Sequence, residues 1–357
     1  MKLLLRVALY PVLIIFDTPK RIKNWIRIKI LRLSDRYVLF GNLQTGIDFA
    51  IVAVYPGTTS YASVLRSLNI FRDLDYQVLV VVNLNEKTPE WVERFVNQGF
   101  NVIQRPNIGA DFGAYKLGIK VLAKSGILDS IQTLILMNDS IYVTPASASV
   151  IQSIAQQGAK SNCIFVHNQG TSHAASMLLK FNQEVIRNKT FREFWKKYYP
   201  YSNKKKTIIK GEHELTKTIG LQAFHPYVST NLLKVDQDVR SFLNQDWLQA
   251  LAWSIRSEKQ AYYYLKSCLE MGEASRAVEY IFTNLQISNS CGLYLSREHN
   301  LPIKMDLTSL ALVSESDFIK ILVEQGCETQ EIEEVEEILS KKHSYFTSSI
   351  LDRISRG

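Results

Sequence analysis

Asp139 is the side chain of this sequence with the clearest potential for metal chemistry. It follows the apolar run 133–137 (TLILM) and lies within the tripeptide Asn138-Asp139-Ser140. A carboxylate at the end of a buried strand is costly unless it is paired or bound to a cation, and carboxylate oxygens are natural ligands of Mg²⁺. We therefore predict that Asp139 binds a divalent cation, Mg²⁺ or Mn²⁺. The alternative is a purely turn-forming Asn-Asp-Ser segment.

The glycine-rich segment 107–116 (NIGADFGAYK) is a second candidate site, because it opens a predicted helix at the end of a strand. Glycines there let backbone N–H groups approach a phosphate or a ribose. We expect Asn107, Gly109 and Asp111 to bind such a group, with Asp111 also capping the helix. A tight turn that needs glycine is the alternative. Residues 111–113 (DFG) match the kinase magnesium motif, but the companion kinase motifs do not accompany it, so we reject a kinase.

Two glutamates, Glu212 and Glu214, follow a lysine-rich stretch at 204–210 and precede a predicted helix at 215–219. Either carboxylate could accept a proton from a substrate hydroxyl. Glutamates in a first helical turn also favour the helix dipole without any catalytic role. The lysines either neutralise phosphate or form a solvated loop.

The elements that position these residues alternate between strand and helix. Continuous apolar runs predict strands, and segments with helical spacing lie between them. A helix is expected to begin with Thr88 as its N-cap and to end at Gly99. The predicted strands are 49–55, 77–82, 100–104 and 133–137, and the first predicted helix is 61–71.

Continuous rather than alternating apolar runs predict an α/β fold with a mainly parallel sheet and helices on both faces. In such sheets ligands bind beyond the carboxyl ends of the strands. Tyr55 ends a predicted strand at that edge, and Asn83, Asn107 and Asn138 follow predicted strands there. The sequence therefore predicts a binding site there.

Two of these segments resemble a known family. Residues 107–114 (NIGADFGA) are similar to an N-x-G-x-D-x-G-A stretch, and residues 136–142 (LMNDSIY) to an L-x-N-D-S-x-Y signature, of the rhamnan synthesis protein F family. This family of bacterial surface-polysaccharide enzymes belongs to the glycosyltransferases with a GT-A-type, Rossmann-like fold. The pattern continues, in order, at Ser176, 191–195 (FREFW), 212–216 (EHELT), Asn289 and 301–304 (LPIK). Residues 290–292 (SCG) depart from the family's N-P-x-H element, so no C-terminal histidine is carried over.

The resemblance implies transfer of a sugar, typically rhamnose from dTDP-rhamnose, to a glycan or lipid-linked acceptor. It places Asp139 on the divalent cation, and Tyr55 and Asn83 near the base and ribose of the nucleotide. Asn138 stands where a standard D-x-D motif has its first aspartate, so strict metal dependence is not implied. If the reaction inverts, Glu212 is the candidate general base.

The N-terminal segment 1–40 is basic and amphipathic, and the chain carries a formal net charge of +8. Each Lys or Arg beside an anionic membrane contributes about 1 kcal/mol to surface binding. No apolar run in the sequence reaches eighteen residues, so no transmembrane helix is predicted. We expect a cytoplasmic protein attached peripherally to the inner face of a bacterial membrane, although an ordinary surface helix would show the same pattern.

Three regions are predicted: the membrane-surface segment 1–40, a catalytic domain at 45–235 and a helical C-terminal region at 236–357. Within the last region we expect helices at 246–256, 259–269 and 274–285, followed by a solvated amphipathic helix at 328–342.

Two rival functions compete with the glycosyltransferase. A catalytically inactive GT-A-fold scaffold or glycan-binding protein would account for the missing aspartate. Nucleic-acid binding is suggested by the aromatic and lysine residues at 194–206, but we expect no nucleic-acid partner.

Overall fold

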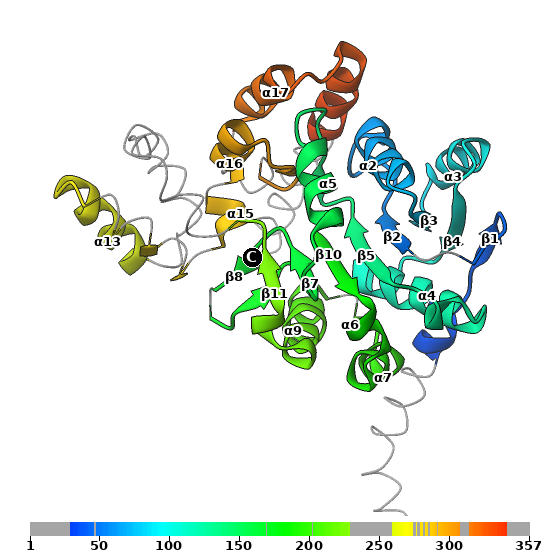
Figure 1. The fold of residues 1–357 in the computed structure, drawn as a ribbon. Coiled ribbons are helices and arrows are strands. Elements are labelled where there is room, and N and C mark those ends of the chain that lie inside the picture. The colour runs from blue at the N-terminus through cyan, green and yellow to red at the C-terminus, as the bar shows by residue number, and fades with distance from the viewer. Residues whose placement is uncertain are drawn as a thin grey trace, which may run out of the picture.

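The computed structural model describes residues 29–45, 48–168, 170–201, 203–228, 259–273, 276, 279–280, 283–284, 286–290, 292–307 and 314–340. Its centre is a mixed sheet with eight strands among the described residues, in the order β1-β4-β3-β2-β5-β10-β7-β11 (Figure 1). These strands are β1 (Val38–Phe40), β2 (Asp48–Val54), β3 (Gln77–Asn83), β4 (Asn101–Arg105), β5 (Thr133–Asn138), β7 (Ser161–Cys163), β10 (Leu178–Asn182) and β11 (Phe224–Pro226).

The predicted parallel core is confirmed. Strands β4, β3, β2 and β5 are adjacent and parallel, and every residue of β2 after Asp48 is buried. The chain runs outward from β2 through β3 to β4 and then crosses back, so that β5 lies on the other side of β2. Beyond β5, the antiparallel strands β10 and β7 and then β11 extend the sheet. The order of the parallel strands therefore reverses between β2 and β5.

Helices cover both faces of the sheet because alternate strand residues point to opposite sides. In β2, Ala50, Val52 and Val54 pack with α2 (Tyr61–Asp73), α3 (Thr88–Asn97) and α5 (Ala148–Gln156). Residues Phe49, Ile51 and Ala53 pack on the other face. The helices on that face are α4 (Ala110–Lys124), α6 (Gln183–Arg187), α7 (Lys189–Lys197) and α9 (Glu214–Ile219).

Short elements complete the described core. They are the 3₁₀-helices η1 (Ile127–Asp129) and η3 (Leu221–Ala223), the helix α8 (Lys204–Thr207), the π-helix η2 (Ile208–His213) and the paired strands β8 (Val166–His167) and β9 (His173–Ala174). The π-helix joins α8 to α9 without a break, so the chain from 204 to 219 is one continuous helical segment.

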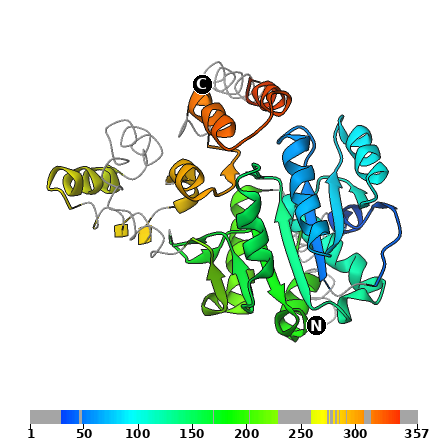
Figure 2. The same ribbon diagram turned by 45° about the horizontal axis from the view of Figure 1, so that its top comes forward.

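The C-terminal region is helical, as predicted, but one strand of it joins the core. Strand β12 (Ile303–Lys304) pairs antiparallel with β6 (Ile141–Tyr142), and β6 is the strand that directly follows the Asn138-Asp139-Ser140 turn. The helices described there are α13 (Lys259–Glu270), α15 (Ile287–Ser290), α16 (Gly292–His299), α17 (Glu315–Glu324) and residues 329–340. In both ribbon views the red helix 329–340 lies near α2, and the orange α17 lies on its far side, toward α16 (Figures 1 and 2).

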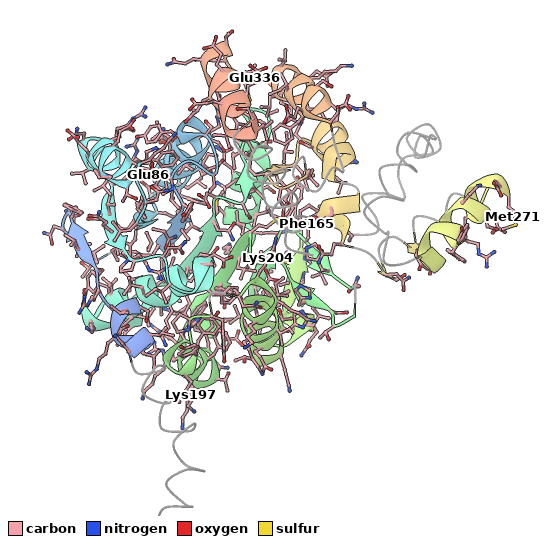
Figure 3. The ribbon with its side chains drawn as sticks, turned by 180° about the vertical axis from the view of Figure 1, so that it is seen from behind. Glu86, Phe165, Lys197, Lys204, Met271 and Glu336 are labelled. Carbon is pink, nitrogen blue, oxygen red and sulfur yellow. The ribbon has the colours of Figure 1, made fainter. Side chains whose placement is uncertain are left out.

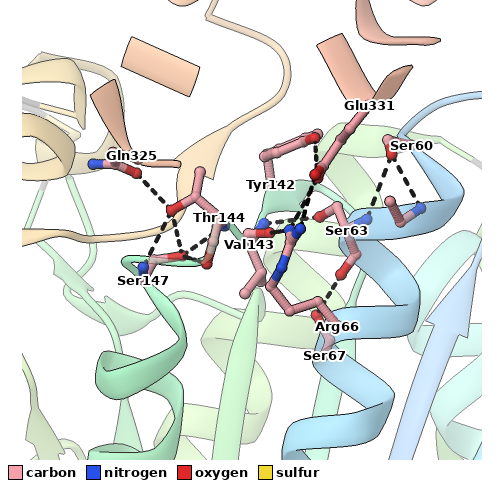
Figure 4. A network of polar contacts seen from close by, with 11 residues as sticks. Ser60, Ser63, Arg66, Ser67, Tyr142, Val143, Thr144, Ser147, Gln325 and Glu331 are labelled. Carbon is pink, nitrogen blue, oxygen red and sulfur yellow. Dashed lines mark hydrogen bonds and ion pairs between the residues drawn. The ribbon is translucent and has the colours of Figure 1, made fainter. Parts of the chain in front are cut away.

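A buried polar network, which we call the Arg66–Glu331 network, fastens helix 329–340 to the core (Figure 4). Arg66 of α2 donates to both carboxylate oxygens of Glu331, at 2.9 and 2.8 Å, and also to the carbonyl of Val143. The Tyr142 hydroxyl donates to the same carboxylate. Beside it, Thr144 Oγ1 donates to Gln325 Oε1 at 2.6 Å.

Two local predictions were wrong, and a third, the amphipathic helix at 328–342, was right except for the solvation of one residue. Thr88 is the first residue of α3 rather than its N-cap, because its hydroxyl donates to the carbonyl of Asn83 instead. Asp111 lies in the first turn of α4, whose N-cap is Gly109. The helix at 329–340 is not merely solvated, because Glu331 is buried by its ion pair with Arg66.

Other predictions fall outside the described residues. Of the N-terminal segment 1–40, residues 1–28 are not described, and residues 29–34 are helical. The predicted helix 246–256 is likewise outside, and 274–285 is described only in part. Helix α13 confirms the one predicted at 259–269. No helix in the described part of the chain combines the length and the apolar character that a membrane span requires.

Candidate functional site

A cavity of about 570 Å³ opens at the carboxyl ends of the parallel strands. It lies where the strand order reverses between β2 and β5, which is the usual ligand position in open α/β sheets. Seven of the eight residues predicted from sequence line it. They are Tyr55, Asn83, Asn107, Asp111, Asn138, Asp139 and Glu212.

Gly109, the eighth predicted residue, does not line the cavity among the described contacts. Its φ is 83°, in the left-handed region, and a Cβ built on it would lie 2.7 Å from the backbone Cα of Pro200. Glycine is therefore required there for backbone conformation and close packing. A tight turn that needs glycine therefore explains Gly109, while Asn107 and Asp111 line the cavity.

Asp139 bridges the two strands that flank the point of reversal. Its Oδ2 accepts the backbone N–H of Tyr55 at 2.6 Å and the Thr58 hydroxyl at 3.3 Å. Its own backbone N–H donates to the carbonyl of Ala53 at 3.2 Å. The carboxylate is thereby held against the end of β2, at the wall of the cavity.

Asn138 is committed to Asp111. Its Nδ2 donates to Asp111 Oδ2 at 2.9 Å, and its Oδ1 accepts the backbone N–H of Ser140 at 3.1 Å. Burial, followed by the nearby charge of Glu212, raises the pKa of Asp111 to about 6. An aspartate at position 138 would add a third carboxylate beside Asp111 and Glu212. The amide of Asn138 instead supplies a hydrogen-bond donor there.

Glu212 enters the cavity from the π-helix η2. Its Oε1 accepts the Ser176 hydroxyl at 2.6 Å, and its Oε2 lies 3.3 Å from His173 Nε2. Burial opposes ionisation, but the hydrogen bonds from His173 and Ser176 outweigh it and lower the pKa of Glu212. The wider turn of a π-helix is often found at functional sites, and here it carries a buried, ionised carboxylate.

The π-helix packs tightly on the glycine-rich segment. A Cβ on Gly211 would lie 2.9 Å from the ring of Phe112, so this position needs glycine for the close approach of η2 to α4. Glu214, the second glutamate considered from the sequence, does not line the cavity and lies 3.7 Å from Lys210. The structure therefore separates the two glutamates.

Histidines 167 and 173 were missed as site residues by the sequence analysis. Both are buried on the paired strands β8 and β9, with ring centroids 5.6 Å apart. Burial opposes the charged form of His173, but the partner Glu212 raises its pKa overall. Burial, followed by repulsion from His173, lowers the pKa of His167 to about 3. Nothing in the local sequence pattern marks either ring, because the partners, Glu212 for His173 and Ser288 for His167, lie far away in the sequence.

The C-terminal region supplies further cavity residues, namely Gln286, Asn289, Lys304 and Asp306. Asn289 and residues 301–304 were singled out only by resemblance. The structure brings them together, because Lys304 Nζ donates to Asn289 Oδ1 at 2.6 Å. Lys204, labelled near the middle of the molecule in Figure 3, also lines the cavity, whereas Lys197 lies at the periphery.

No three His, Cys, Asp or Glu side chains converge into a metal-binding group within the described residues. Asp139 offers one carboxylate. Mg²⁺ in proteins is commonly held by one or two carboxylates together with substrate phosphates, so this donor set fits a cation only in company with a bound diphosphate.

The fold and the site define an α/β protein with a polar ligand cavity at the switch point of a mainly parallel sheet. The family model of rhamnan synthesis protein F matches residues 78–286, more than half of the chain. The chain belongs to this family, which confirms the resemblance seen in the sequence. The family takes its name from rhamnan synthesis.

The chain is also 26% identical over 208 residues to the uncharacterized protein y4gN of Sinorhizobium fredii (strain NBRC 101917 / NGR234). The similar region covers 56% of this chain and 53% of that protein. The chain therefore spans about half the length of this relative. Strand β2, Tyr55 and Lys304 lie outside the residues that the family model matches.

Proposed function

We propose that this protein is a glycosyltransferase that moves a sugar, rhamnose in the first instance, from a nucleotide-sugar donor to a glycan or lipid-linked acceptor. The observation that carries the proposal is the cavity at the β2–β5 switch point, whose wall holds both Asp139 and the ionised Glu212. Asp139 would bind the donor, and Glu212 would deprotonate the acceptor. Family membership supports the polysaccharide context.

The nucleotide would bind along the ends of β2, β3 and β4, against Tyr55, Asn83 and Asn107. Asn83 is buried, and its Nδ2 donates to the carbonyl of Val54 at 3.2 Å. Its Oδ1 has no hydrogen-bond partner among the described residues. A buried acceptor without a partner is unfavourable, and a ribose hydroxyl or a base N–H would satisfy it.

Asp139 would face the diphosphate, and its carboxylate would hold Mg²⁺ or Mn²⁺ when the donor is bound. When bound, such a cation neutralises the charge that develops on the departing diphosphate. The chain's own contribution is to hold the carboxylate, through the N–H of Tyr55, at the edge of the sheet.

Glu212 would act as the general base of an inverting displacement. The carboxylate takes the proton of the acceptor hydroxyl while the hydroxyl oxygen forms a bond to the anomeric carbon. The bond from that carbon to the donor's diphosphate breaks, and the diphosphate leaves with the electron pair. His173 and Ser176 keep the base ionised and oriented before the acceptor arrives.

Donor binding tests this proposal through Asp139→Asn, which keeps an oxygen for the N–H of Tyr55 but removes the charge. We expect one of the dTDP, UDP or GDP sugars, given with Mn²⁺ or Mg²⁺, to raise the melting temperature of the wild-type protein. In the variant the dissociation constant should rise at least about tenfold, the loss of one good charge contact. Asp75→Asn, at an exposed residue with a φ of 63°, is the matched control.

The opposite outcome is equally informative. A folded wild-type protein that no nucleotide sugar stabilises, yet that binds a glycan, would overturn the enzyme and favour the inactive scaffold or glycan-binding alternative. Asp139→Asn would then leave glycan binding unchanged.

We also propose that the N-terminal face contacts an anionic membrane. Strand β1 lies at the end of the basic segment 1–40. Tyr37, just before the strand, and Val38 and Leu39 within it are exposed, and Val38 is 54% accessible. Basic charge beside exposed apolar side chains suits a headgroup surface. Vesicles with phosphatidylglycerol should sediment the protein at low salt, and vesicles of phosphatidylcholine alone should not.

Replacing Lys20, Arg21 and Lys23 by glutamine should abolish this sedimentation, whereas Lys196→Gln with Lys197→Gln on α7 should not. Equal binding to both kinds of vesicle would contradict an electrostatic attachment.

A further inference from the structure

Lys304 reaches the candidate site through an element that lies far from it in the sequence. Pairing of β12 with β6 sets Lys304 opposite Ile141, and the N–H of Met305 donates to the carbonyl of Ser140 at 2.9 Å. Strand β6 follows Asp139 after a single residue. The backbone therefore fixes Lys304 beside the Asn138-Asp139-Ser140 turn, independently of side-chain packing.

The ammonium group of Lys304 is held in place rather than extended into solvent. Its side chain is only 16% exposed, and it contacts Asn289 Oδ1 at 2.6 Å and Asp306 Oδ1 at 3.4 Å. An ammonium group carries three N–H donors. Among the described residues these two contacts engage two of them, and the third can serve a ligand. Asn289 belongs to α15, so two C-terminal elements orient the same cation.

A second cation stands at the mouth of the cavity. Lys204 Nζ lies 3.5 Å from Asp306 Oδ2, and its side chain is 84% exposed. One carboxylate, that of Asp306, thus lies between two ammonium groups. Burial, together with repulsion from Lys204, lowers the pKa of Lys304 despite the attraction of Asp306. An anionic ligand beside this mostly buried ammonium group would stabilise its charged form.

We propose that Lys304 and Lys204 form a diphosphate subsite, so that the C-terminal segment completes the donor site beside Asp139. This inference rests on the proposed glycosyltransferase function and deepens it. The phosphates would lie between the carboxylate of Asp139, with its cation, and the ammonium group of Lys304. The two lysines and the divalent cation would then both neutralise the charge of the leaving diphosphate. Such help is useful because asparagine at position 138 leaves the cation only one carboxylate at this turn, that of Asp139.

A purely structural role for Lys304 is the competing explanation, because the same ammonium group ties α15 to β12 through Asn289. The two explanations differ in ligand dependence. A structural lysine would affect the binding of every ligand, or of none, whereas a diphosphate subsite affects only ligands that carry the phosphates.

The test is calorimetric titration of the full-length protein in EDTA, so that only protein cations can bind the anion. The probes are pyrophosphate, the diphosphates dTDP, UDP and GDP, and the matching nucleosides. Lys304→Met should weaken pyrophosphate and the preferred nucleoside diphosphate about 10- to 100-fold, the value of one charged hydrogen bond. Nucleoside binding should be unchanged. Lys204→Met should have a smaller effect in the same direction because the group is exposed.

Lys320→Met, on α17 and 73% exposed, removes the same charge at a residue that does not line the cavity, and serves as the control. If Lys304→Met fails to fold, Lys204→Met decides the matter, since its exposed side chain contributes little to folding. Unchanged pyrophosphate binding in every folded variant, equal loss of nucleoside and diphosphate binding, or no binding by the wild-type protein would each overturn the subsite.

The two proposals fail in different ways. Sugar transfer by a protein whose pyrophosphate affinity is indifferent to Lys304 and Lys204 would remove the subsite and keep the enzyme. Pyrophosphate binding that depends on Lys304, in a protein that accepts no nucleotide sugar, would keep the subsite and remove the enzyme.

Discussion

Replacing Glu212 by glutamine is expected to slow sugar transfer about 10²- to 10⁴-fold, the usual contribution of a general base. Glutamine cannot accept the proton of the acceptor hydroxyl, although it can still accept the Ser176 hydroxyl. Donor binding should change little, since the nucleotide would lie at the other side of the cavity. The measurement is the initial rate of transfer at saturating donor, together with donor affinity by titration.

Glu214→Gln is the matched control for this experiment. Glu214 lies two residues further along the same helical segment and pairs with Lys210 at the surface, where its side chain is 45% exposed. It should retain the wild-type rate. A similar loss of activity in both variants would point to a structural effect on the helical segment rather than to lost base catalysis.

The pH profile offers an independent signature of the same residue. Because the net effect of its surroundings is to lower the pKa of Glu212, the base stays ionised to more acid pH than an ordinary glutamate. The transfer rate should fall only as the pH drops through that lowered value, and this limb should be missing from the Glu212→Gln profile. A limb centred near pH 6 would instead report protonation of Asp111.

The second large effect is expected on stability, from Glu331→Gln. This substitution removes the charge that compensates Arg66, whose side chain is 21% exposed against 5% for Glu331. Breaking a mostly buried ion pair on one side leaves an uncompensated cation, and we expect the free energy of unfolding to fall by about 3 kcal/mol. Urea denaturation of wild-type and variant protein measures the difference.

Glu336→Gln on the same helix is the control, because Glu336 is exposed at the outer edge of the molecule (Figure 3). It should change stability by no more than about 0.5 kcal/mol. Adding Arg66→Met to Glu331→Gln should recover part of the loss, since the unpaired cation is then absent. If Glu331→Gln is no more destabilising than the control, the network does not anchor the C-terminal helices.

The Arg66–Glu331 network also connects stability with the site. Tyr142 and Val143 follow the Asn138-Asp139-Ser140 turn closely, and α2 follows Tyr55 after a short loop. Loosening the network would free both segments that carry Asp139 and its hydrogen-bond donor. Donor affinity is therefore expected to fall in Glu331→Gln, although Glu331 does not line the cavity.

The sequence by itself determined the parallel core and its polar edge. Apolar runs such as 77–82 and 133–137 are local signals, and they specify buried strands whatever the rest of the chain does. Once the strands are parallel, their carboxyl ends must share one edge. Asn83, Asn107 and Asp139 could therefore be assigned to one cavity before any coordinates were known.

Only the tertiary structure decided what surrounds these residues. Glu212 and Glu214 look alike in sequence, and the π-helical turn packed against Phe112 decides which of them enters the cavity. Glu331 resembles its solvated neighbours until Arg66, 265 positions away, is seen to pair with it. Lys304 reaches the site through the pairing of β12 with β6. Such contacts depend on how distant elements pack, and no periodicity within a single segment encodes them.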